Sequence, residues 1–248
     1  MTNDFEGKVA LITGAGAGIG RAVVLRLAEA RATIVGVDRD AVALAETAGM
    51  IGGRMTQSIV DLTDPVACAS VVADAVEAHG RLDILGNIAG MACAELLADV
   101  TIDQYRRMMA VNADAPFFLT QAAMPHLVRS NGSVISLAST AGVIGQAFTS
   151  TYCMSKAAVI QMTKALAMEF LKTGVRINAI APGGINTPLI QNFTVPDGVD
   201  MDLMGRYAGV RGVGEPEDVA ALFAFLVSDE GKGFHGAVLN LDHGVTAG

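Results

Sequence analysis

Short apolar segments of strand length alternate with longer segments of helical periodicity along the whole chain, and this alternation limits the folds open to it. The expected strands cover residues 8–12, 33–37, 55–60, 82–85, 133–137, 175–180 and 237–241, and the expected helices cover residues 18–30, 65–79, 101–128, 151–173 and 217–228. Apolar strands separated by helices form a parallel sheet that is covered on both faces. The sequence therefore predicts an α/β fold with a doubly wound, seven-stranded parallel sheet, in a single domain over residues 1–248.

The balance of apolar and charged residues excludes several classes of protein. Apolar residues make up 52% of the chain and charged residues 17%, which is the composition of a folded protein and not of a disordered one. The net charge is −8 and no run of Lys or Arg occurs, so nucleic acid is not expected as a partner. Charges such as Lys8, Arg21 and Glu29 interrupt the apolar stretches, so no membrane span is expected either. The apolar surplus favours an oligomer.

The cysteines and histidines indicate a reducing compartment and no metal site. Cys68, Cys93 and Cys153 lack the spacing of a metal or redox motif, and Cys153 is interpreted as a buried apolar filler beside Tyr152. His79, His126 and His235 also lack ligand spacing. The polar, acidic start of the chain differs from a signal peptide, so we expect a cytoplasmic protein.

A glycine-rich run, TGAGAGIG at residues 13–20, lies between the first expected strand and helix. Gly14 permits a tight turn, while Gly18 and Gly20 let backbone amides approach a pyrophosphate, as in Rossmann-like folds. Asp38 ends the second strand, where a carboxylate binds a ribose hydroxyl and repels a 2′-phosphate, so NAD is favoured over NADP. The adjacent Arg39 is the counter-argument, since a guanidinium binds phosphate. Asp38 as the N-cap of the next helix is the alternative interpretation.

Tyr152 and Lys156 lie four residues apart in an expected helix and therefore share one face. An ammonium near a phenol favours the phenolate, so Tyr152 could accept the proton of a hydroxyl group while hydride leaves the same carbon. A surface helix pair is the alternative. Ser139 follows the fifth expected strand and could bind the substrate oxygen, although the residues alone do not distinguish it from Ser136.

With these motifs the chain resembles the short-chain dehydrogenase/reductase family, in its single-domain form of about 250 residues. The resemblance covers essentially the whole chain and implies a catalytic set of Asn112, Ser139, Tyr152 and Lys156. Ser139 is favoured over Ser136 because it lies 13 residues before Tyr152. The cofactor-binding residues that it implies are Gly14, Gly18, Ile19, Asp38, Arg39, Asp61, Leu62, Asn87, Ala89, Gly90, Tyr152, Lys156, Pro182, Gly183, Ile185 and Thr187.

The resemblance also implies roles and an assembly. Tyr152 is expected to be the general acid/base, Lys156 to lower its pKa and bind the nicotinamide ribose, Ser139 to orient the substrate oxygen, and Asn112 to hold a water that relays protons from Lys156. A homotetramer, or less often a dimer, is expected through helices 101–128 and 151–173. Two residues depart from the family pattern. Ile88 replaces an Asn, and little effect is expected because the preceding Asn87 carries the main structural hydrogen bonds in such proteins. His243 replaces a Gly and is expected to be structural and not catalytic.

The family resemblance implies that residues 185–211 cover the substrate. Three expected pocket walls are rich in apolar residues: Leu189, Ile190, Phe193, Val195, Val199, Met201, Leu203, Met204 and Tyr207 in this segment, Val143, Ile144 and Phe148 after Ser139, and Met91, Leu96 and Leu97 after Gly90. We expect a medium-sized apolar secondary alcohol or ketone as substrate. Core or interface packing of the same residues is the alternative. No Lys or Arg lies between Thr187 and Met204, which argues against a phosphorylated or acyl-carrier substrate, although Arg206 and Arg211 weaken that point.

Three functions are compatible with these residues. The first is an NAD-dependent alcohol dehydrogenase or ketone reductase. The second is an NADPH-dependent 3-oxoacyl-thioester reductase, against which Asp38 counts. The third is a non-catalytic dinucleotide sensor, which is disfavoured because all four catalytic positions are present.

Overall fold

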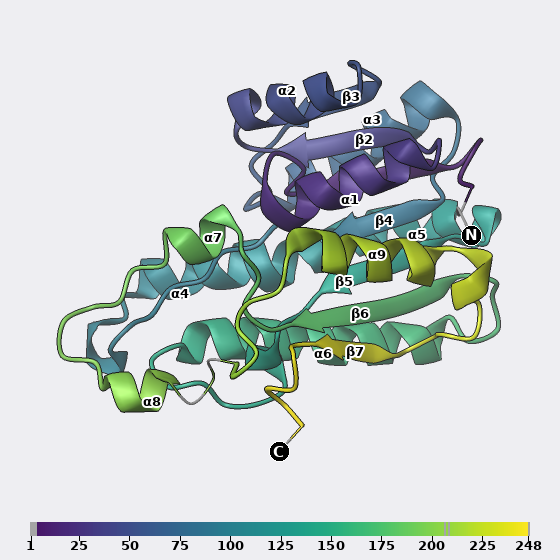
Figure 1. The fold of residues 1–248 in the computed structure, drawn as a ribbon. Coiled ribbons are helices and arrows are strands. Elements are labelled where there is room, and N and C mark those ends of the chain that lie inside the picture. Colours follow the sequence, from purple (N-terminus) through teal and green to yellow (C-terminus); the bar gives the residue numbers. More distant parts are fainter. Residues whose placement is uncertain (1–3, 206, 208, 248) are drawn as a thin grey trace.

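The computed structural model describes residues 4–205, 207 and 209–247, which form a seven-stranded parallel sheet (Figure 1). The strands run in the order β3-β2-β1-β4-β5-β6-β7. Their bounds are β1 (Val9–Thr13), β2 (Thr33–Asp38), β3 (Met55–Ile59), β4 (Ile84–Asn87), β5 (Ser133–Leu137), β6 (Arg176–Pro182) and β7 (Val238–Leu241). The predicted doubly wound sheet is confirmed. Its order reverses between β1 and β4, and ligands bind at such a point, beyond the carboxyl ends of the strands.

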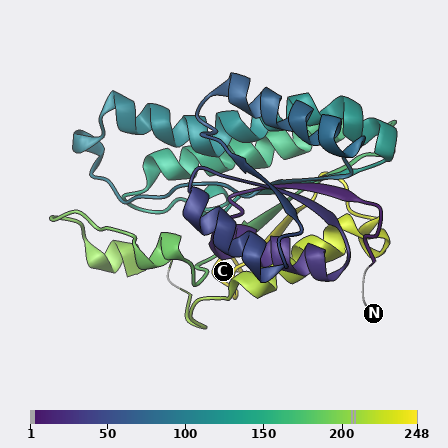
Figure 2. The same cartoon turned by 90° about the horizontal axis from the view of Figure 1, so that it is seen from above.

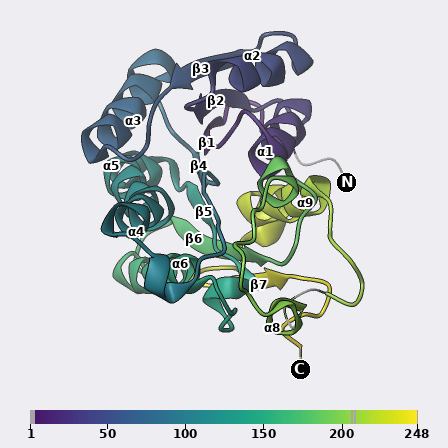
Figure 3. The ribbon, with the colours of Figure 1, turned by 90° about the vertical axis from the view of Figure 1, so that its left-hand side faces the viewer.

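Helices cover both faces of the sheet, as the views from above and from the side show (Figures 2 and 3). One face carries α1 (Gly18–Glu29), α2 (Ala41–Met50) and α9 (Pro216–Val227). The other carries α3 (Pro65–His79), α4 (Ile102–Met109), α5 (Ala115–Ser130) and α6 (Ser150–Glu169). An apolar core lies on each side, with Phe223 and Leu27 in one and Leu85 and Leu119 in the other. This two-sided burial explains why the central strands are apolar throughout.

Two helical features differ from the prediction. Helix α2 is absent from the predicted helices. The N-cap that could have indicated it is Asp40, which accepts hydrogen bonds from the amides of Val42 and Ala43. The single helix expected at residues 101–128 is divided into α4 and α5 by a π-helical turn, η2 (Ala110–Asp114). The turn contains Asn112, and π-turns within helices are frequent at functional sites.

The segment after β6 forms two short helices, α7 (Pro188–Gln191) and α8 (Met201–Gly205), which project beyond the carboxyl edge of the sheet (Figure 1). Among the described residues, no helix combines the length and apolar character needed to cross a membrane.

Candidate active site

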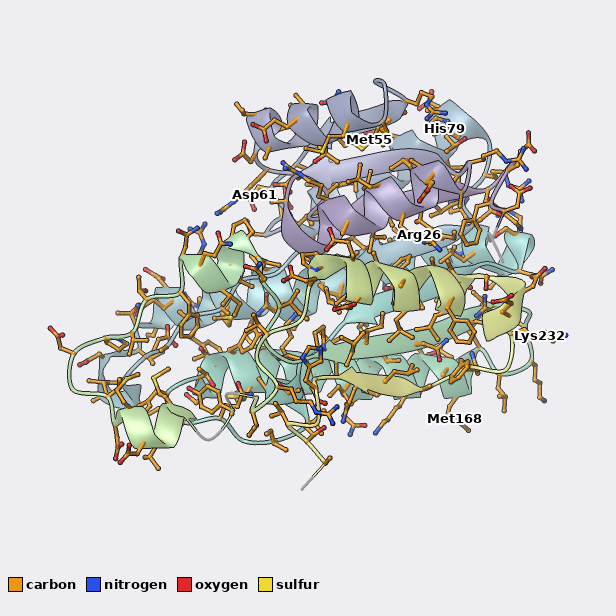
Figure 4. All side chains as sticks on the ribbon, in the orientation of Figure 1. Arg26, Met55, Asp61, His79, Met168 and Lys232 are labelled. Carbon is orange, nitrogen blue, oxygen red and sulfur yellow. The ribbon has the colours of Figure 1, made fainter. Side chains whose placement is uncertain are left out.

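The predicted site residues gather beyond the carboxyl ends of β1, β2, β4, β5 and β6. A cavity of about 250 Å³ lies there. Its lining includes Gly14, Gly18, Ile19, Asp38, Ala89, Gly90, Ser139, Tyr152, Lys156, Pro182, Gly183, Ile185 and Thr187. An adjoining cavity of about 180 Å³ shares Asp38 and adds Arg39, Asp61 and Leu62. Figure 4 shows Asp61 at this edge of the sheet, with Lys232 at the opposite edge. Asn87 and Asn112 line neither cavity and lie behind the walls.

The glycine run forms the turn between β1 and α1. Gly18 has a φ of +51°, and a Cβ on it would lie 3.0 Å from the Thr187 side chain. A Cβ on Gly20 would lie 2.0 Å from the carbonyl oxygen of Gly14. No other residue type fits these two positions without moving the loop. The first amides of α1 therefore open directly onto the cavity, in an arrangement that fits the pyrophosphate of a dinucleotide.

Thr13, which the sequence analysis did not single out as a site residue, joins the glycine loop to the end of β4. Its buried hydroxyl accepts hydrogen bonds from the amides of Ile88 and Ala89, at 2.9 and 3.0 Å, and donates to the carbonyl of Gly86. These contacts hold the backbone of Ala89, which lines the cavity, against the loop. The sequence signal for Thr13 was its position at the end of β1, because the carboxyl ends of all parallel strands meet at the edge of the sheet where the site lies.

Asp38 is bound to the glycine loop. One carboxylate oxygen accepts a hydrogen bond from the amide of Gly16 at 2.9 Å, and the other accepts from the amide of Asp40 at 3.0 Å. The interpretation of Asp38 as the N-cap of the next helix is wrong, because Asp40 caps α2. The carboxylate of Asp38 lines both cavities, so it is available to a ribose hydroxyl group.

The adjoining cavity is lined by the carboxylates of Asp38 and Asp61 and by two cations, Arg39 and Arg107. Hydrogen bonds from Thr63 hold the pKa of Asp61 below its usual value, and the charges of Arg107 and Arg39 lower it further. Leu62, behind Asp61, is buried. Arg39 and Arg107 are exposed at the rim. The cavity is therefore polar at its mouth, with apolar side chains behind.

Ser139, Tyr152 and Lys156 meet at the floor of the larger cavity. Ser139 follows β5, and its hydroxyl is hydrogen-bonded to Tyr152. The ammonium of Lys156 lies 5.8 Å from the centre of the Tyr152 ring and donates to the carbonyl of Leu137 at 2.8 Å. Burial raises the pKa of Tyr152, partly offset by the Ser139 hydrogen bond, and lowers the pKa of Lys156 to about 8.

Ser136, the alternative to Ser139, points into the protein. It accepts a hydrogen bond from the side-chain amide of Asn87 at 3.2 Å, and Thr120 accepts another at 3.1 Å. Asn87 thus links β4 to β5 and α5, while its buried Oδ1 atom has no partner among the described residues. Only Ser139 of the two serines lines the cavity.

The side chain of Asn112, in the π-helical turn, bonds to residues outside its helix and also to the sulfur of Met108 in α4. Its side-chain oxygen accepts from the amide of Met91 at 2.9 Å, and its side-chain nitrogen donates to the carbonyl of Met91 and to the Ser155 hydroxyl. A Cβ on Gly90 would lie 3.3 Å from Asn112 and 3.4 Å from the ammonium of Lys156. Asn112 and Lys156 therefore meet around Gly90, without a direct hydrogen bond.

The strap that follows β6, residues 184–186, contributes Ile185 to the lining of the larger cavity. The amide of Gly183 donates to the carbonyl of Leu241, and residues 184–186 pair with Gly214. His243 lies below this strap with a φ of +54°, in the left-handed region that favours glycine, and its ring lies against Gly214. The Gly-to-His departure from the family pattern therefore falls in a structural turn. Ile88, the other departure, is buried in the core.

Of the three expected apolar walls, only part lines the larger cavity. Met91, Leu189 and Ile190 do so. Leu97, Val143 and Met201 are exposed, and Met204 is buried. Tyr207 ties the segment to the loop after Ser139, because its hydroxyl donates to the carbonyl of Ala147 at 3.0 Å. Arg206, one of the two arginines that weaken the argument against a phosphorylated substrate, lies outside the described residues.

The three cysteines are free thiols. Cys68 is fully buried, and burial raises the pKa of Cys93 to about 12. Cys153 is half-buried, not buried as expected, because its sulfur lies at the surface of the first turn of α6 beside the hydroxyl of Thr149.

Comparison with known proteins identifies the family. The family described as enoyl-(acyl carrier protein) reductase matches residues 14–246. A 2,5-dichloro-2,5-cyclohexadiene-1,4-diol dehydrogenase of Sphingobium indicum is 39% identical, and the alignment covers 100% of both chains. Two solved short-chain dehydrogenases are similar in structure. The one from Mycobacterium paratuberculosis, bound to NAD, is 31% identical with a TM-score of 0.91, covering 99% of this chain and 100% of the other. The one from Burkholderia cenocepacia, in complex with NADP, is 34% identical with a TM-score of 0.88, and the match covers 98% of this chain and 100% of the other.

The fold and the site thus define an oxidoreductase that uses a nicotinamide dinucleotide. The chain belongs to the short-chain dehydrogenase/reductase family.

Proposed function

We propose that this protein is an NAD-dependent dehydrogenase that interconverts a medium-sized, mainly apolar secondary alcohol and its ketone. The observation that carries the proposal is the meeting of Ser139, Tyr152 and Lys156 at the floor of a cavity that begins at the glycine loop. A bound dinucleotide supplies the hydride acceptor or donor. The side chains at the floor then bind the reacting oxygen and move its proton.

Each catalytic residue has a task that its surroundings support. Tyr152 exchanges a proton with the substrate oxygen, and its raised pKa keeps the hydroxyl protonated for ketone reduction. Ser139 donates to the same oxygen and shares a hydrogen bond with Tyr152. Lys156 binds the nicotinamide ribose and favours the phenolate during oxidation. Asn112 positions Gly90 and Met91 near Lys156 and holds the relay water.

The cofactor is NAD, held by the residues that line the two cavities. The pyrophosphate binds at Gly14, Gly18 and Ile19. Asp38 accepts from the adenine ribose and repels a 2′-phosphate, while Asp61 and Leu62 hold the adenine. Asn87, Ala89 and Gly90 form the back wall, and Arg39 lies at the rim. Pro182, Gly183, Ile185 and Thr187 bind the nicotinamide end.

The substrate class follows from the apolar side of the larger cavity. Met91, Leu189 and Ile190 supply apolar side chains to its lining, which is more apolar than polar. Residues 185–211 cover the substrate. The diol dehydrogenase relative is named for a cyclic secondary alcohol, which supports the same class here. A 3-oxoacyl-thioester reductase is the second candidate, because the description of the matching family names an acyl-carrier substrate, although the reaction it names is enoyl reduction.

The protein works as a cytoplasmic homotetramer in this proposal. Exposed apolar side chains on α5 and α6 support the assembly, because Phe117 is 43% exposed, Met154 52% and Met168 70%. Met168 lies on the outer side of α6 in Figure 4. The three free thiols fit a reducing compartment.

The test is nicotinamide absorbance over a panel of cyclic and linear secondary alcohols, with NAD and with NADP, for the wild type and for Tyr152→Phe. We expect turnover with NAD that falls by a factor of at least about a hundred in the variant, because the proton-transfer group is lost. The variant should bind NADH as the wild type does. Near-parental turnover in Tyr152→Phe contradicts the assigned role. Turnover of acyl thioesters with NADPH alone favours the second candidate, and dinucleotide binding without turnover of any substrate favours the sensor.

A further inference from the structure

The carbonyl oxygen of Gly16, in the middle of the glycine loop, is bound from behind by two side chains. The guanidinium of Arg21 donates to it through Nε at 3.0 Å and also through Nη2. The hydroxyl of Thr47, which is fully buried on α2, lies 3.3 Å from the same oxygen and 3.1 Å from the carbonyl oxygen of Ala43, and it shares its one proton between the two. Neither Arg21 nor Thr47 lines the nucleotide cavity. They form a layer of side chains behind the loop.

Arg21 is itself fixed by α2. Its Nη2 atom donates to the carboxylate of Glu46 at 3.0 Å, and its Nε atom donates to the Thr47 hydroxyl at 3.0 Å. The Arg21 side chain is only 25% exposed, so these charge-assisted hydrogen bonds are partly shielded from water. The guanidinium therefore has little freedom to leave the Gly16 carbonyl.

The other side of Gly16 is held as well, since its amide donates to the carboxylate of Asp38 at 2.9 Å. Two successive peptide groups of the loop are thus fixed by side chains. In a trans peptide the C=O of one residue and the N–H of the next point in opposite directions. Binding the Gly16 carbonyl toward Arg21 consequently turns the amide of Ala17 away from Arg21. That amide has no partner among the described residues, and Ala17 lines the cavity.

We infer that Arg21 is a positioning residue for the dinucleotide. It acts through the Gly16–Ala17 peptide, whose orientation presents the Ala17 amide and the first amides of α1 to the pyrophosphate. Thr47 supports the same carbonyl. The inference rests on the proposed function, because it requires that this cavity binds a dinucleotide.

The test measures NADH and ADP-ribose binding by titration calorimetry for the wild type, Arg21→Met, Arg21→Lys and Arg26→Met. Arg26 is the matched control, because it lies on the same helix, away from the loop (Figure 4), and its side chain pairs at the surface with Glu29. We expect Arg21→Met to raise the Kd of both ligands about tenfold and Arg26→Met to leave it unchanged. The Kd values of Arg21→Lys should lie between those of the wild type and Arg21→Met, since a single ammonium replaces the several donors of the guanidinium. At saturating cofactor, kcat of Arg21→Met should stay within about twofold of the wild type while KM for the cofactor rises.

Thr47→Val is the second variant, in case Arg21→Met does not fold. It removes one donor to the Gly16 carbonyl at nearly constant volume and should raise the Kd of NADH about threefold. Unchanged NADH affinity in the folded Arg21→Met protein, or in Thr47→Val if only that variant folds, overturns the inference and leaves the proposed function intact. If the wild type binds neither NADH nor NADPH, the proposed function fails, and this inference fails with it.

Discussion

At the scale of single residues, two carboxylates close in the chain have different neighbours. Asp38 accepts hydrogen bonds from the amides of Gly16 and Asp40 and lines the cavities, whereas Asp40 binds only the first turn of α2. The sequence placed an acid at the end of β2 correctly, but it did not reveal that Asp40 already supplies the cap. This separation lets the role in cofactor choice be tested independently of helix capping.

Asp38→Ala should shift the ratio of kcat/KM for NADP over NAD upward by about tenfold, because the carboxylate that repels the 2′-phosphate is gone. Efficiency with NAD should fall, since the Gly16 amide also loses its acceptor. Asp40→Ala is the control, and it should lower the free energy of unfolding by about 1 kcal/mol without changing the ratio. Steady-state kinetics with both cofactors and urea unfolding measure these effects. Equal shifts of the ratio in both variants would contradict the assignment.

Burial is the residue-scale property that the sequence did not reveal. The spacing of Tyr152 and Lys156 correctly predicts that they share a helix and a site. It also suggests that the ammonium lowers the pKa of Tyr152. In the folded chain desolvation is the larger effect, and it moves the two pKa values in opposite directions. The strength of desolvation depends on residues that are distant in the chain, which no local pattern contains.

At the scale of elements, the sequence predicts those with a strong period and fails where side chains alter the backbone. The strands agree with prediction to within about two residues, since most of their apolar runs end at or next to Gly, Asp or Asn, as at Gly14, Asp38 and Asn87. The single helix expected at residues 101–128 is interrupted because Asn112 bonds to Met91 and Ser155, on other elements. Helix α2 was missed because it is short and Ala-rich, and it buries only Leu44, Thr47 and Ala48.

Residues 185–211, which we propose cover the substrate and which we call the covering segment, offer a prediction at this scale. Tyr207→Phe removes the hydrogen bond to the carbonyl of Ala147 and so releases a tie between this segment and the loop after Ser139. We expect KM for the alcohol to rise roughly fivefold, with the Kd of NADH unchanged. Tyr105→Phe is the control, because Tyr105 is exposed on α4. The same KM for the alcohol in Tyr207→Phe and in the wild type would show that the tie does not shape the substrate site.

At the scale of the whole molecule, Lys156 makes stability depend on pH. It is only 4% exposed and its pKa falls from 10.5 to about 8. The unfolded chain therefore holds this proton more tightly than the folded protein does. Stability should rise between about pH 8 and pH 10, by up to about 3 kcal/mol. Above that range Tyr152 acts in the opposite sense, because its pKa is raised by burial.

Lys156→Met should abolish this gain, because the variant has no ammonium to desolvate. Urea midpoints of the wild type and the variant at about pH 7.5 and about pH 9.5, at one protein concentration, measure the difference. The wild type should gain stability relative to Lys156→Met as the pH rises. Parallel changes in the two proteins would mean that the Lys156 ammonium is not desolvated in the folded state.

The covering segment is attached to the rest of the chain mainly near its ends. The strap at residues 184–186 pairs with Gly214, and Tyr207 bonds to Ala147, while Leu189, Ile190, Met201 and Leu203 remain exposed. Of the described residues in this segment, only Ile185 belongs to either of the two apolar cores. Substitutions between the ties thus cost the scaffold little, while they change what enters the cavity. In evolutionary terms, selection can change the substrate of such a protein while it leaves the glycine loop and the two apolar cores unchanged.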